Sequence, residues 1–316
     1  MSVVLWLVTG VPAWAIRRCG DDVDGKRVPC RCGDLLVSSR TLGERDRITR
    51  DVCPGGGLMV DAAGPVTLAL GGHTVRGSGQ SAGVLVLRGT LTITGPGGIE
   101  RFHTGLMARG PAALASAVGL RVAENRHAGI AIDAAGYAIQ GCVAEHNGGD
   151  GFMLGGSAYA LDGNRAVGNG RYGFNLMGMG AHAGGGLGNE AIGNMMTGFF
   201  VRGFLHQIVG ATATENMGDG VFASVHHTLL ADVRADRNQH DGVQAMGMLL
   251  AVADSSAADN RGFGIWVNAP DVQDGGGNRG AGNAGLTGRA TAVSVVVREK
   301  MGPLVQCRIG MAGACR

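Results

Sequence analysis

Two aspartates in matching positions are the residues of this sequence best placed to do chemistry. Asp219 and Asp241 each precede a glycine, and they lie 22 residues apart. If 22 residues make one turn of a coil of stacked strands, the two α-carbons lie ~5 Å apart. Carboxylates at that spacing can separate their pKa values, share a cation such as Ca²⁺, or act as acid and nucleophile on a glycoside. His240 could supply a general base and Arg202 a cation.

Turn formation is the competing interpretation of both aspartates. Asp-Gly is a common turn dipeptide, because the Asp side chain hydrogen-bonds locally and Gly permits a positive φ. His240 could likewise be a solvated turn residue, and the same holds for His206, His226 and His227. The sequence leaves both interpretations open.

A repeated phrase of about 22 residues determines where these side chains lie. It reads Ala-x-x-Asn-x-x-x-Gly-apolar-x-apolar and recurs, with gaps of 22, 22, 25, 22, 22, 22 and 23 residues, between about residues 119 and 288. The repeated asparagines are Asn125, Asn147, Asn169, Asn194, Asn216, Asn238, Asn260 and Asn283. A period in the low twenties predicts a solenoid, whose repeats bury their apolar faces only by stacking on each other.

The apolar positions within each repeat predict strands. The first and third residues after each repeat glycine are apolar, which is the period of a strand. Two further apolar columns complete three short strands per repeat, with glycine at the corners. No segment has a helical period, and the signature of leucine-rich repeats is missing. We therefore predict an all-β parallel β-helix of about ten or eleven coils.

One asparagine per coil predicts a ladder of side-chain amides. Asparagine tolerates left-handed backbone, and its amide both donates and accepts, so residues stacked ~4.8 Å apart can bond along the column. Asn164 and Asn189 lie five residues before two of the repeated asparagines and predict a shorter second stack. The role of these asparagines is expected to be structural.

The second residue after each repeat glycine must face outward, because it lies between two inward positions. In four successive coils this column reads Phe200, Phe222, Gln244 and Trp266. It is more apolar than contact with water requires. The column is therefore either a binding surface or a strip that a loop, the C-terminal tail or a second molecule covers.

The repeats and an upstream segment resemble the secreted right-handed parallel β-helix proteins of the pectate-lyase-like superfamily. The leading strand of that family often contains Asn-Gly-His-Thr, where this chain has Gly71-Gly72-His73-Thr74. The resemblance covers roughly residues 30 to 300 and implies a right-handed parallel β-helix. It also implies that extended polysaccharide binds along the outside of one sheet, with aromatic side chains supporting the sugar rings.

The resemblance does not specify an activity, because the superfamily contains lyases, hydrolases and epimerases. The chain lacks an Asp-Asp pair accompanied by the Gly-His-Gly and Arg-Ile-Lys of polygalacturonase-type hydrolases, and it lacks the Asp-Pro-His-Glu of alginate epimerases. If the protein is an enzyme, we expect a polysaccharide lyase or glycoside hydrolase that uses Asp219, Asp241, Arg202 and His240. The alternative is a structural or adhesive rod without catalysis.

The two ends of the chain are expected to differ from the repeats. Residues 1–15 are apolar and end in Ala-Trp-Ala, which predicts a secretory signal peptide that is too short to span a bilayer. We expect an N-terminal cap at 16–60, the β-helix at 61–298 and a C-terminal cap at 299–316. The formal charge of +2 argues against a nucleic-acid partner. No cofactor or metal site is predicted, apart from Ca²⁺ at the two aspartates.

Six of the seven cysteines flank the repeats and predict disulfides in the caps. Cys307 with Cys315 is the expected C-terminal pair. The four N-terminal cysteines allow three pairings, of which Cys19 with Cys30 and Cys32 with Cys53 is preferred. A zinc site is the alternative, although Cys-x-Cys is tighter than the usual ligand spacing. Cys142, alone within the repeats, is expected to be a buried and inert thiol.

Overall fold

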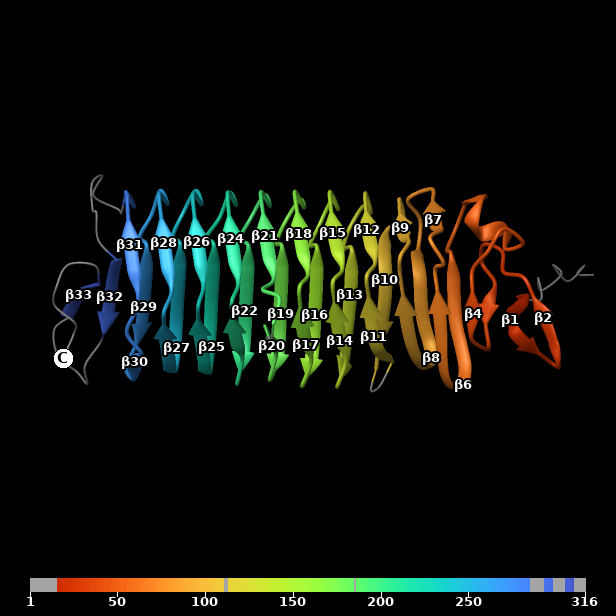
Figure 1. Ribbon diagram of the computed structural model, residues 1–316, viewed down its shortest axis with the longest axis horizontal. Helices are drawn as coiled ribbons and strands as arrows, with labels where there is room; N and C mark the ends of the chain where they lie inside the picture. Colours follow the sequence, from red (N-terminus) through yellow and green to blue (C-terminus); the bar gives the residue numbers. More distant parts are fainter. Residues whose placement is uncertain (1–15, 111–112, 185, 285–292, 298–304, 310–316) are drawn as a thin grey trace, which may run out of the picture.

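The protein is a single parallel β-helix (Figure 1). The computed structural model describes residues 16–110, 113–184 and 186–284, together with the backbone of 293–297 and 305–309. Strands of successive coils lie side by side along the long axis, and the chain advances from one end of the rod to the other. The one helical element of the described residues is the 3₁₀ turn η1 (Arg47–Thr49). Accordingly, no helix of that part is long and apolar enough to cross a membrane.

One sheet contributes a short strand to every coil, and its strands follow one another in sequence order. They are β5 (Val52–Cys53), β7 (Thr74–Gly77), β9 (Gly98–Glu100), β12 (Arg121–Ala123), β15 (Val143–Glu145), β18 (Arg165–Val167), β21 (Glu190–Ile192), β24 (Thr212–Thr214), β26 (Arg234–Asp236), β28 (Ser256–Ala258) and β31 (Arg279–Ala281). Neighbours pair in parallel, as β12 does with β9 and β15. These 11 strands confirm the predicted number of coils.

The strands that follow the repeat glycines form a second face, which we call the leading sheet. It contains β10 (Thr104–Arg109), β13 (Ile130–Ala135), β16 (Phe152–Ser157), β19 (Phe174–Met179), β22 (Phe199–Phe204), β29 (Ile265–Ala269) and the first halves of β6 (Leu58–Ala69), β8 (Ala82–Thr94), β25 (Val221–Ala231) and β27 (Val243–Ala253).

A third face consists of the strands that come next in each coil. They are β11 (Leu114–Val118), β14 (Ala138–Gln140), β17 (Ala160–Asp162), β20 (His182–Ala183), β23 (Gln207–Val209), β30 (Val272–Asp274) and the second halves of β6, β8, β25 and β27. In those last four, one long strand bends through both faces. The coil thus has the three strands that its apolar columns predict.

The N-terminal end is closed by a cap with two disulfides. The hairpin of β1 (Arg18–Val23) and β2 (Lys26–Val28) is antiparallel, β1 pairs with β3 (Leu35–Leu36), and β3 and β4 (Arg40–Thr41) pair with β6. Cys19 is bonded to Cys30 and Cys32 to Cys53, which confirms the preferred pairing. At the other end, β32 (Val293–Val297) pairs with β29 and with β33 (Val305–Ile309). The expected pair of Cys307 and Cys315 lies outside the residues whose side chains are described.

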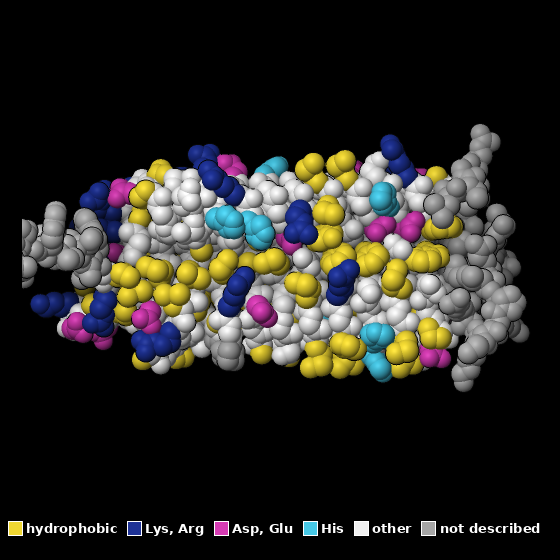
Figure 2. Space-filling view, turned by 180° about the vertical axis from the view of Figure 1, so that it is seen from behind, with side chains coloured by type: hydrophobic (Ala, Val, Ile, Leu, Met, Phe, Trp, Pro, Cys, Tyr) yellow, Lys and Arg dark blue, Asp and Glu magenta, His cyan; other side chains and the backbone are white. Residues whose placement is uncertain are grey.

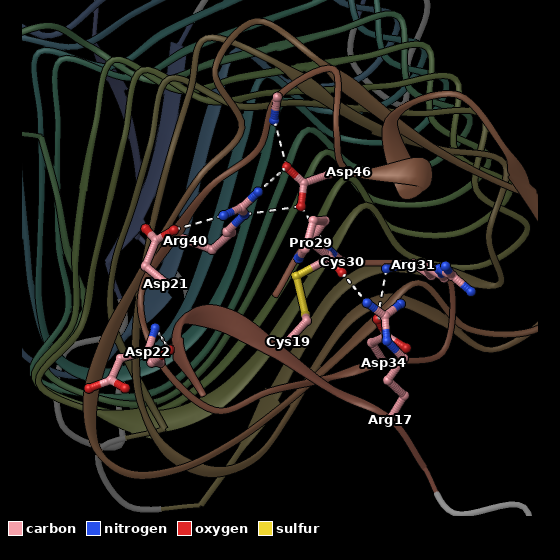
Figure 3. The surroundings of a disulfide bond; sticks show 12 residues. Arg17, Cys19, Asp21, Asp22, Pro29, Cys30, Arg31, Asp34, Arg40 and Asp46 are labelled. Atoms are coloured by element: carbon pink, nitrogen blue, oxygen red, sulfur yellow. Dashed lines mark hydrogen bonds and ion pairs between the residues drawn. A yellow bond between two sulfur atoms is a disulfide. The ribbon is translucent and has the colours of Figure 1, made fainter. Parts of the chain in front are cut away.

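A buried ion-pair network lies beside the first disulfide (Figure 3). Arg40 donates from Nη2 to Asp46 Oδ2 at 2.7 Å, from Nε to Asp46 Oδ1 at 3.0 Å and from Nη1 to Asp21 Oδ1 at 2.7 Å. The backbone N–H of Cys30 donates to Asp46 Oδ1 at 2.6 Å. Both charges of the inner pair are therefore matched and hydrogen-bonded, as buried charges must be. The cap therefore covers the end of the core with polar groups that are hydrogen-bonded. A β-helix that ended in an ordinary coil would instead expose the unpaired edge of its last strands.

The asparagine ladder runs unbroken along the corner that follows the short-strand sheet. Nδ2 of Asn194 donates to Oδ1 of Asn216 at 2.9 Å and to the carbonyl oxygen of Ala166 at 3.1 Å, while its own Oδ1 accepts from N and Nδ2 of Asn169, each at 3.0 Å. The same bonds join every neighbouring pair in the column that starts at Asn125 and ends at Asn283. Asn164 and Asn189 form the predicted shorter stack at 3.0 Å. The amides are buried, and both ladders are confirmed.

The left-handed residue of this corner is not the asparagine. It is the residue before it, such as Glu215 with φ 60° or Arg237 with φ 54°. The repeat glycines do not have positive φ either, so the predicted Asp-Gly turn with a left-handed glycine is wrong. A Cβ on Gly220 would lie 2.5 Å from the carbonyl oxygen of Gly242 and 2.7 Å from Nδ2 of Asn238. Glycine is required there because the next coil packs too closely for any side chain.

The coil with 25 residues keeps the register of its neighbours. Arg165 pairs with Glu190 and Ala166 with Ala191, although 25 residues separate each pair instead of 22. The additional length is accommodated between β20 and β21, where Leu187 is exposed. The three additional residues at this corner therefore leave the strand pairing of the coil intact.

Candidate binding face

The outward column of the leading sheet is in register across the coils. Phe200 pairs with Phe222, Phe222 with Gln244, and Gln244 with Trp266. Their inward neighbours are buried, whereas these four side chains are half-buried, which agrees with the predicted alternation. Two earlier members of the column, Ala131 and Asn175, are buried, contrary to the prediction that the whole column is exposed. A small or short side chain in this column is covered by its larger neighbours.

Hydrophobic side chains form a band along this rod. Figure 2, which views the side farthest from the reader in Figure 1, shows that the band follows the long axis, with histidines and charged side chains beside it. On the leading sheet, the exposed hydrophobic side chains include Met177, Met179, Phe204 and Met248. The apolar character predicted for the outward column therefore extends to the neighbouring outward positions of the same strands.

Three aromatic rings stack on one another within the band. The ring centroids of Tyr172 and Phe200 are 4.5 Å apart, and those of Phe200 and Phe222 are 5.3 Å apart, with nearly parallel planes. The guanidinium of Arg202 also lies 4.7 Å from the ring centroid of Phe200. Both faces of Phe200 are thus occupied, and only its edge is available to a ligand. Trp266 lies one coil beyond Gln244 and does not stack on Tyr172, Phe200 or Phe222. It is therefore a better candidate than Phe200 for stacking on a sugar ring.

A notch of about 380 Å³ interrupts the outward columns near the middle of the rod. It exists because Gly155 stands in register between Asp133 and Met177, where other coils carry a side chain. Arg109 and Asp133 supply charged groups to its wall, and Met153 and Met177 supply apolar ones. A second hollow adjoins the notch, because Met177 and Gly178 line both of them. Its other lining residues include Met179, Arg202 and Phe204. Sequence reasoning missed this site, and its signal was a glycine in an outward column.

A buried polar pair lies next to the aromatic stack. Asn175 donates from Nδ2 to Asp150 Oδ2 at 2.8 Å, and the backbone N–H of Tyr172 donates to Asp150 Oδ1 at 3.3 Å. Oδ1 of Asn175 has no hydrogen-bond partner. The pair was not predicted, because its two members belong to different columns of neighbouring coils.

Asp219 and Asp241 lie in consecutive coils, as predicted, and their carboxylates accept backbone hydrogen bonds. Asp219 Oδ1 accepts from the N–H of Asp241 at 3.0 Å, and Asp241 Oδ1 accepts from the N–H of Phe263 at 2.7 Å. Each carboxylate therefore caps the following coil, one turn along the rod. The hydrogen bonds are not local turn bonds, although they do give the aspartates a structural role.

Burial dominates the titration of this aspartate pair. Burial, with a smaller contribution from the charge of Asp241, raises the pKa of Asp219 to about 6, although the hydrogen bond from the Asp241 N–H and the charge of His240 oppose the shift. Burial also raises the pKa of Asp241, against the hydrogen bond from Phe263 and the charge of His240. A carboxyl that titrates near neutral pH could exchange protons with a ligand.

The other two predicted catalytic residues are placed differently. His240 is exposed and directly precedes Asp241, so it lies at the same corner. Arg202 is in register with Ser224, which is five residues beyond Asp219 along an extended strand, or roughly 16 Å. The structure therefore gathers Asp219, Asp241 and His240 but leaves Arg202 with the aromatic stack.

His206 has a structural role. Its Nδ1 accepts from the N–H of Ala181 at 3.2 Å, and its Nε2 donates to the carbonyl oxygen of Arg202 at 3.1 Å. Burial lowers the pKa of this imidazole. Within the described residues, no three His, Cys, Asp or Glu side chains gather closely enough to hold a metal ion, so the predicted Ca²⁺ site gains no third ligand from these types.

The fold and the ladder define a parallel β-helix protein. No protein family model matches the sequence, and no curated protein sequence matches it. Among solved structures, the chain is similar to the A-module of the mannuronan C-5 epimerase AlgE4 of Azotobacter vinelandii, with 14% identity, a TM-score of 0.44 and coverage of 83% of this chain and 90% of that one. It is also similar to a double mutant of the periplasmic alginate epimerase AlgG, with 12% identity, a TM-score of 0.47 and coverage of 82% and 70%. The fold assignment itself rests on the strand pairing of the chain.

Proposed function

We propose that this protein binds extended polysaccharide along the outer surface of the leading sheet. The notch at Gly155 carries the proposal, because it combines apolar walls from Met153 and Met177 with the charged groups of Arg109 and Asp133. A sugar ring has the same mixture, with C–H groups on its faces and hydroxyls at its rim. Concave sites with an apolar lining and a few polar groups are typical of ligand binding.

The shape of the surface favours a long ligand over a compact one. The strands of successive coils repeat in register for the whole length of the leading sheet, so the notch, the neighbouring hollow and the aromatic stack lie along one straight line of coils. A linear chain can contact all of them at once, and Trp266 adds an aromatic face farther along. Arg109 and Asp133 are exposed, and neither takes part in an ion pair among the described residues. Both are thus free to bond hydroxyl or charged groups of a sugar.

A role in catalysis is the second candidate, and it belongs to the corner of Asp219, Asp241 and His240. The observation in its favour is the pKa of Asp219, which burial raises to about 6. In this proposal Asp219 and Asp241 exchange protons with a bound sugar, while Arg202 contributes to binding. Unchanged turnover of a bound polysaccharide by the double variant Asp219→Asn/Asp241→Asn would leave the two aspartates only their capping role.

Export from the cytoplasm is part of the proposal. Two disulfides in the N-terminal cap are typical of proteins that fold in an oxidising compartment. Residues 1–15, which have the composition of a signal peptide, lie outside the described residues. A secreted or periplasmic location would also bring the protein into contact with polysaccharides.

Filling the notch is the direct test of the binding proposal. A Cβ on Gly155 would lie 3.3 Å from Oδ1 of the flexible Asp133 side chain and 3.8 Å from the carbonyl oxygen of Ile132, so we expect Gly155→Leu to fold normally. Calorimetric titration with panels of neutral and acidic oligosaccharides should show binding that Gly155→Leu weakens at least tenfold. Arg165→Ala, which removes an exposed ion pair on the short-strand sheet, is the matched control and should bind normally. If no sugar binds and the protein self-associates with rising concentration, a structural or adhesive role of the rod is the better interpretation of the apolar surface.

A further inference from the structure

The tripeptide Met-Gly-Met occurs twice on the outer face of the leading sheet. Met177 and Met179 belong to β19, and Met246 and Met248 belong to β27. Met177, Met179 and Met248 are exposed, and Met246 is half-buried. Residues two apart on a strand share a face, so each tripeptide presents two thioethers side by side to solvent. Exposed apolar side chains that are clustered in this way are candidates for contact with a ligand or partner.

The two tripeptides have different neighbours, although their positions in the coil are the same. Met248 is in register with His226, and Met246 is in register with Ser224. Met179 is in register with Phe204, and Met177 is in register with Arg202. Only the tripeptide on β27 therefore has an imidazole beside its thioethers, and the one on β19 has a cation instead.

His226 is held in place and is incompletely satisfied. Its ring stacks on Phe204 of the preceding coil, with centroids 5.3 Å apart and planes 19° apart. Stacking occupies a ring face but leaves the edge, which carries both nitrogens. Nδ1 is buried and has no hydrogen-bond partner. Because a buried polar atom is normally paired, an orphaned imidazole nitrogen beside two thioethers points to a missing ligand.

We propose that His226, Met246 and Met248 form a binding site for a soft monovalent metal ion, Cu(I) or its chemical equivalent Ag(I). Strand neighbours lie ~4.8 Å apart and alternate residues ~7 Å apart, so three side chains from these positions can converge on one ion. Thioethers are soft, uncharged ligands that select Cu(I), and an imidazole completes a three-coordinate set. Hard cations require carboxylate or carbonyl oxygens, which these three side chains do not offer.

The free thiol of the described residues, that of Cys142, does not compete for the ion. Cys142 is fully buried, and burial raises the pKa of its thiol to about 11, so it stays protonated at neutral pH. The four cap cysteines are oxidised in disulfides. Silver is the better probe because, unlike Cu(I), it needs no reductant that could open these bonds.

The test uses the full chain with its disulfides intact, titrated with silver nitrate in chloride-free buffer. Calorimetry should give one tight site per chain, and spectra of protein labelled with ¹³C at the methionine methyl groups should show two resonances that move together. Met246→Leu/Met248→Leu should abolish the tight site, and His226→Gln should weaken it at least tenfold. Leucine conserves the volume of methionine, so the fold is retained.

The other tripeptide provides the matched control. Met177→Leu/Met179→Leu removes the same number of thioethers from the same positions of a different coil and should leave the tight site unchanged. Equal weakening by the two double variants would overturn the proposal, because it would mean that exposed sulfur binds silver without the imidazole. Absence of saturable silver binding in the unmodified protein, or unchanged affinity in His226→Gln, would also overturn it. Circular dichroism of each variant without silver verifies that the fold is intact.

Discussion

The leading sheet carries two stacks of three aromatic rings, one on each of its faces. Phe152, Phe174 and Phe199 stack inside the coil with centroids 4.6 Å apart. Tyr172, Phe200 and Phe222 stack outside it at 4.5 and 5.3 Å. The inner rings are fully buried, whereas the outer rings are half-buried. Ring spacing is therefore a consequence of the coil spacing on both sides, and it does not reveal a binding role.

The two faces differ in how uniform their columns are. Inward columns repeat one kind of side chain, because each must fill the same cross-section in every coil, and the asparagine ladder is the extreme case. The outward column changes from Met153 to Asn175, Phe200 and Gln244 within a few coils. Variation is tolerated only where packing does not decide the residue. Function on this scaffold is thus expected where the repeat is broken, as it is at Gly155 and His226.

The largest expected effect is a difference in the free energy of unfolding between variants of Phe174 and Phe200, which are the central rings of the inner and outer stacks. Phe174→Ala should lower the free energy of unfolding by about 3–5 kcal/mol, because it opens a cavity between two rings in a close-packed core. Phe200→Ala, its counterpart outside, should cost about 1 kcal/mol, since it loses ring stacking and little burial. Urea denaturation of the two variants measures the difference. Similar losses for both would mean that the outer stack is covered in solution.

The ladder extends the comparison to polar residues. Asn194→Ala should cost about 2–4 kcal/mol, because the buried backbone N–H of Asn169 loses its acceptor, and the carbonyl oxygen of Ala166 and the side-chain amides of Asn169 and Asn216 each lose one hydrogen bond. Asn268→Ala, on the outer side of β29, is the control and should change stability by less than about 0.5 kcal/mol. Urea unfolding followed by circular dichroism tests both. Equal effects would contradict a structural role that is specific to the ladder.

Asp219 lies at the boundary between the faces and should show a smaller, pH-dependent effect. Burial raises its pKa to about 6, so the folded state holds the proton more tightly than the unfolded state does. The carboxyl therefore opposes folding as the pH rises from about 4 to 6, and the penalty persists above that range. Asp219→Asn keeps an acceptor for the Asp241 N–H and removes the charge. It should be more stable than the unmodified protein by about 1–2 kcal/mol at pH 8 and equal to it near pH 4, as measured by thermal unfolding.

Most of the fold could be predicted from the sequence, because the repeated columns report on the same environment several times. The alternation of buried and outward positions and the two asparagine stacks follow from spacing alone, whereas the N-terminal disulfide pairing was one of three that the sequence allowed. The reason for the repeat glycines does not, since the contact of Gly220 with Asn238 involves a residue of the next coil. Local dipeptide rules suggested a turn there, and those rules omit neighbours that are distant in sequence.

The candidate sites could be predicted only in part. Spacing placed Asp219 and Asp241 together, but the N–H groups that their carboxylates cap belong to backbone that no side-chain pattern describes. The outward aromatic column was predicted, whereas the occupation of both faces of Phe200 depends on ring orientation. The notch and the unpaired Nδ1 of His226 arise from individual departures from the repeat. A consensus of the repeats does not contain such departures, because each of them occurs in a single coil.

The coil with three additional residues shows where this architecture can change in evolution. Its surplus chain leaves the stack between β20 and β21 and returns to the same partners, and the two asparagine bonds across it keep their 3.0 Å length. A coil is thus defined by its points of pairing, and the chain between those points can lengthen without cost to its neighbours. Insertions at this corner could accumulate, or be grafted by design, and give one coil a projecting loop with a specificity of its own. The stacked coils would then form a constant scaffold, and the loops at this corner could be exchanged without changing it.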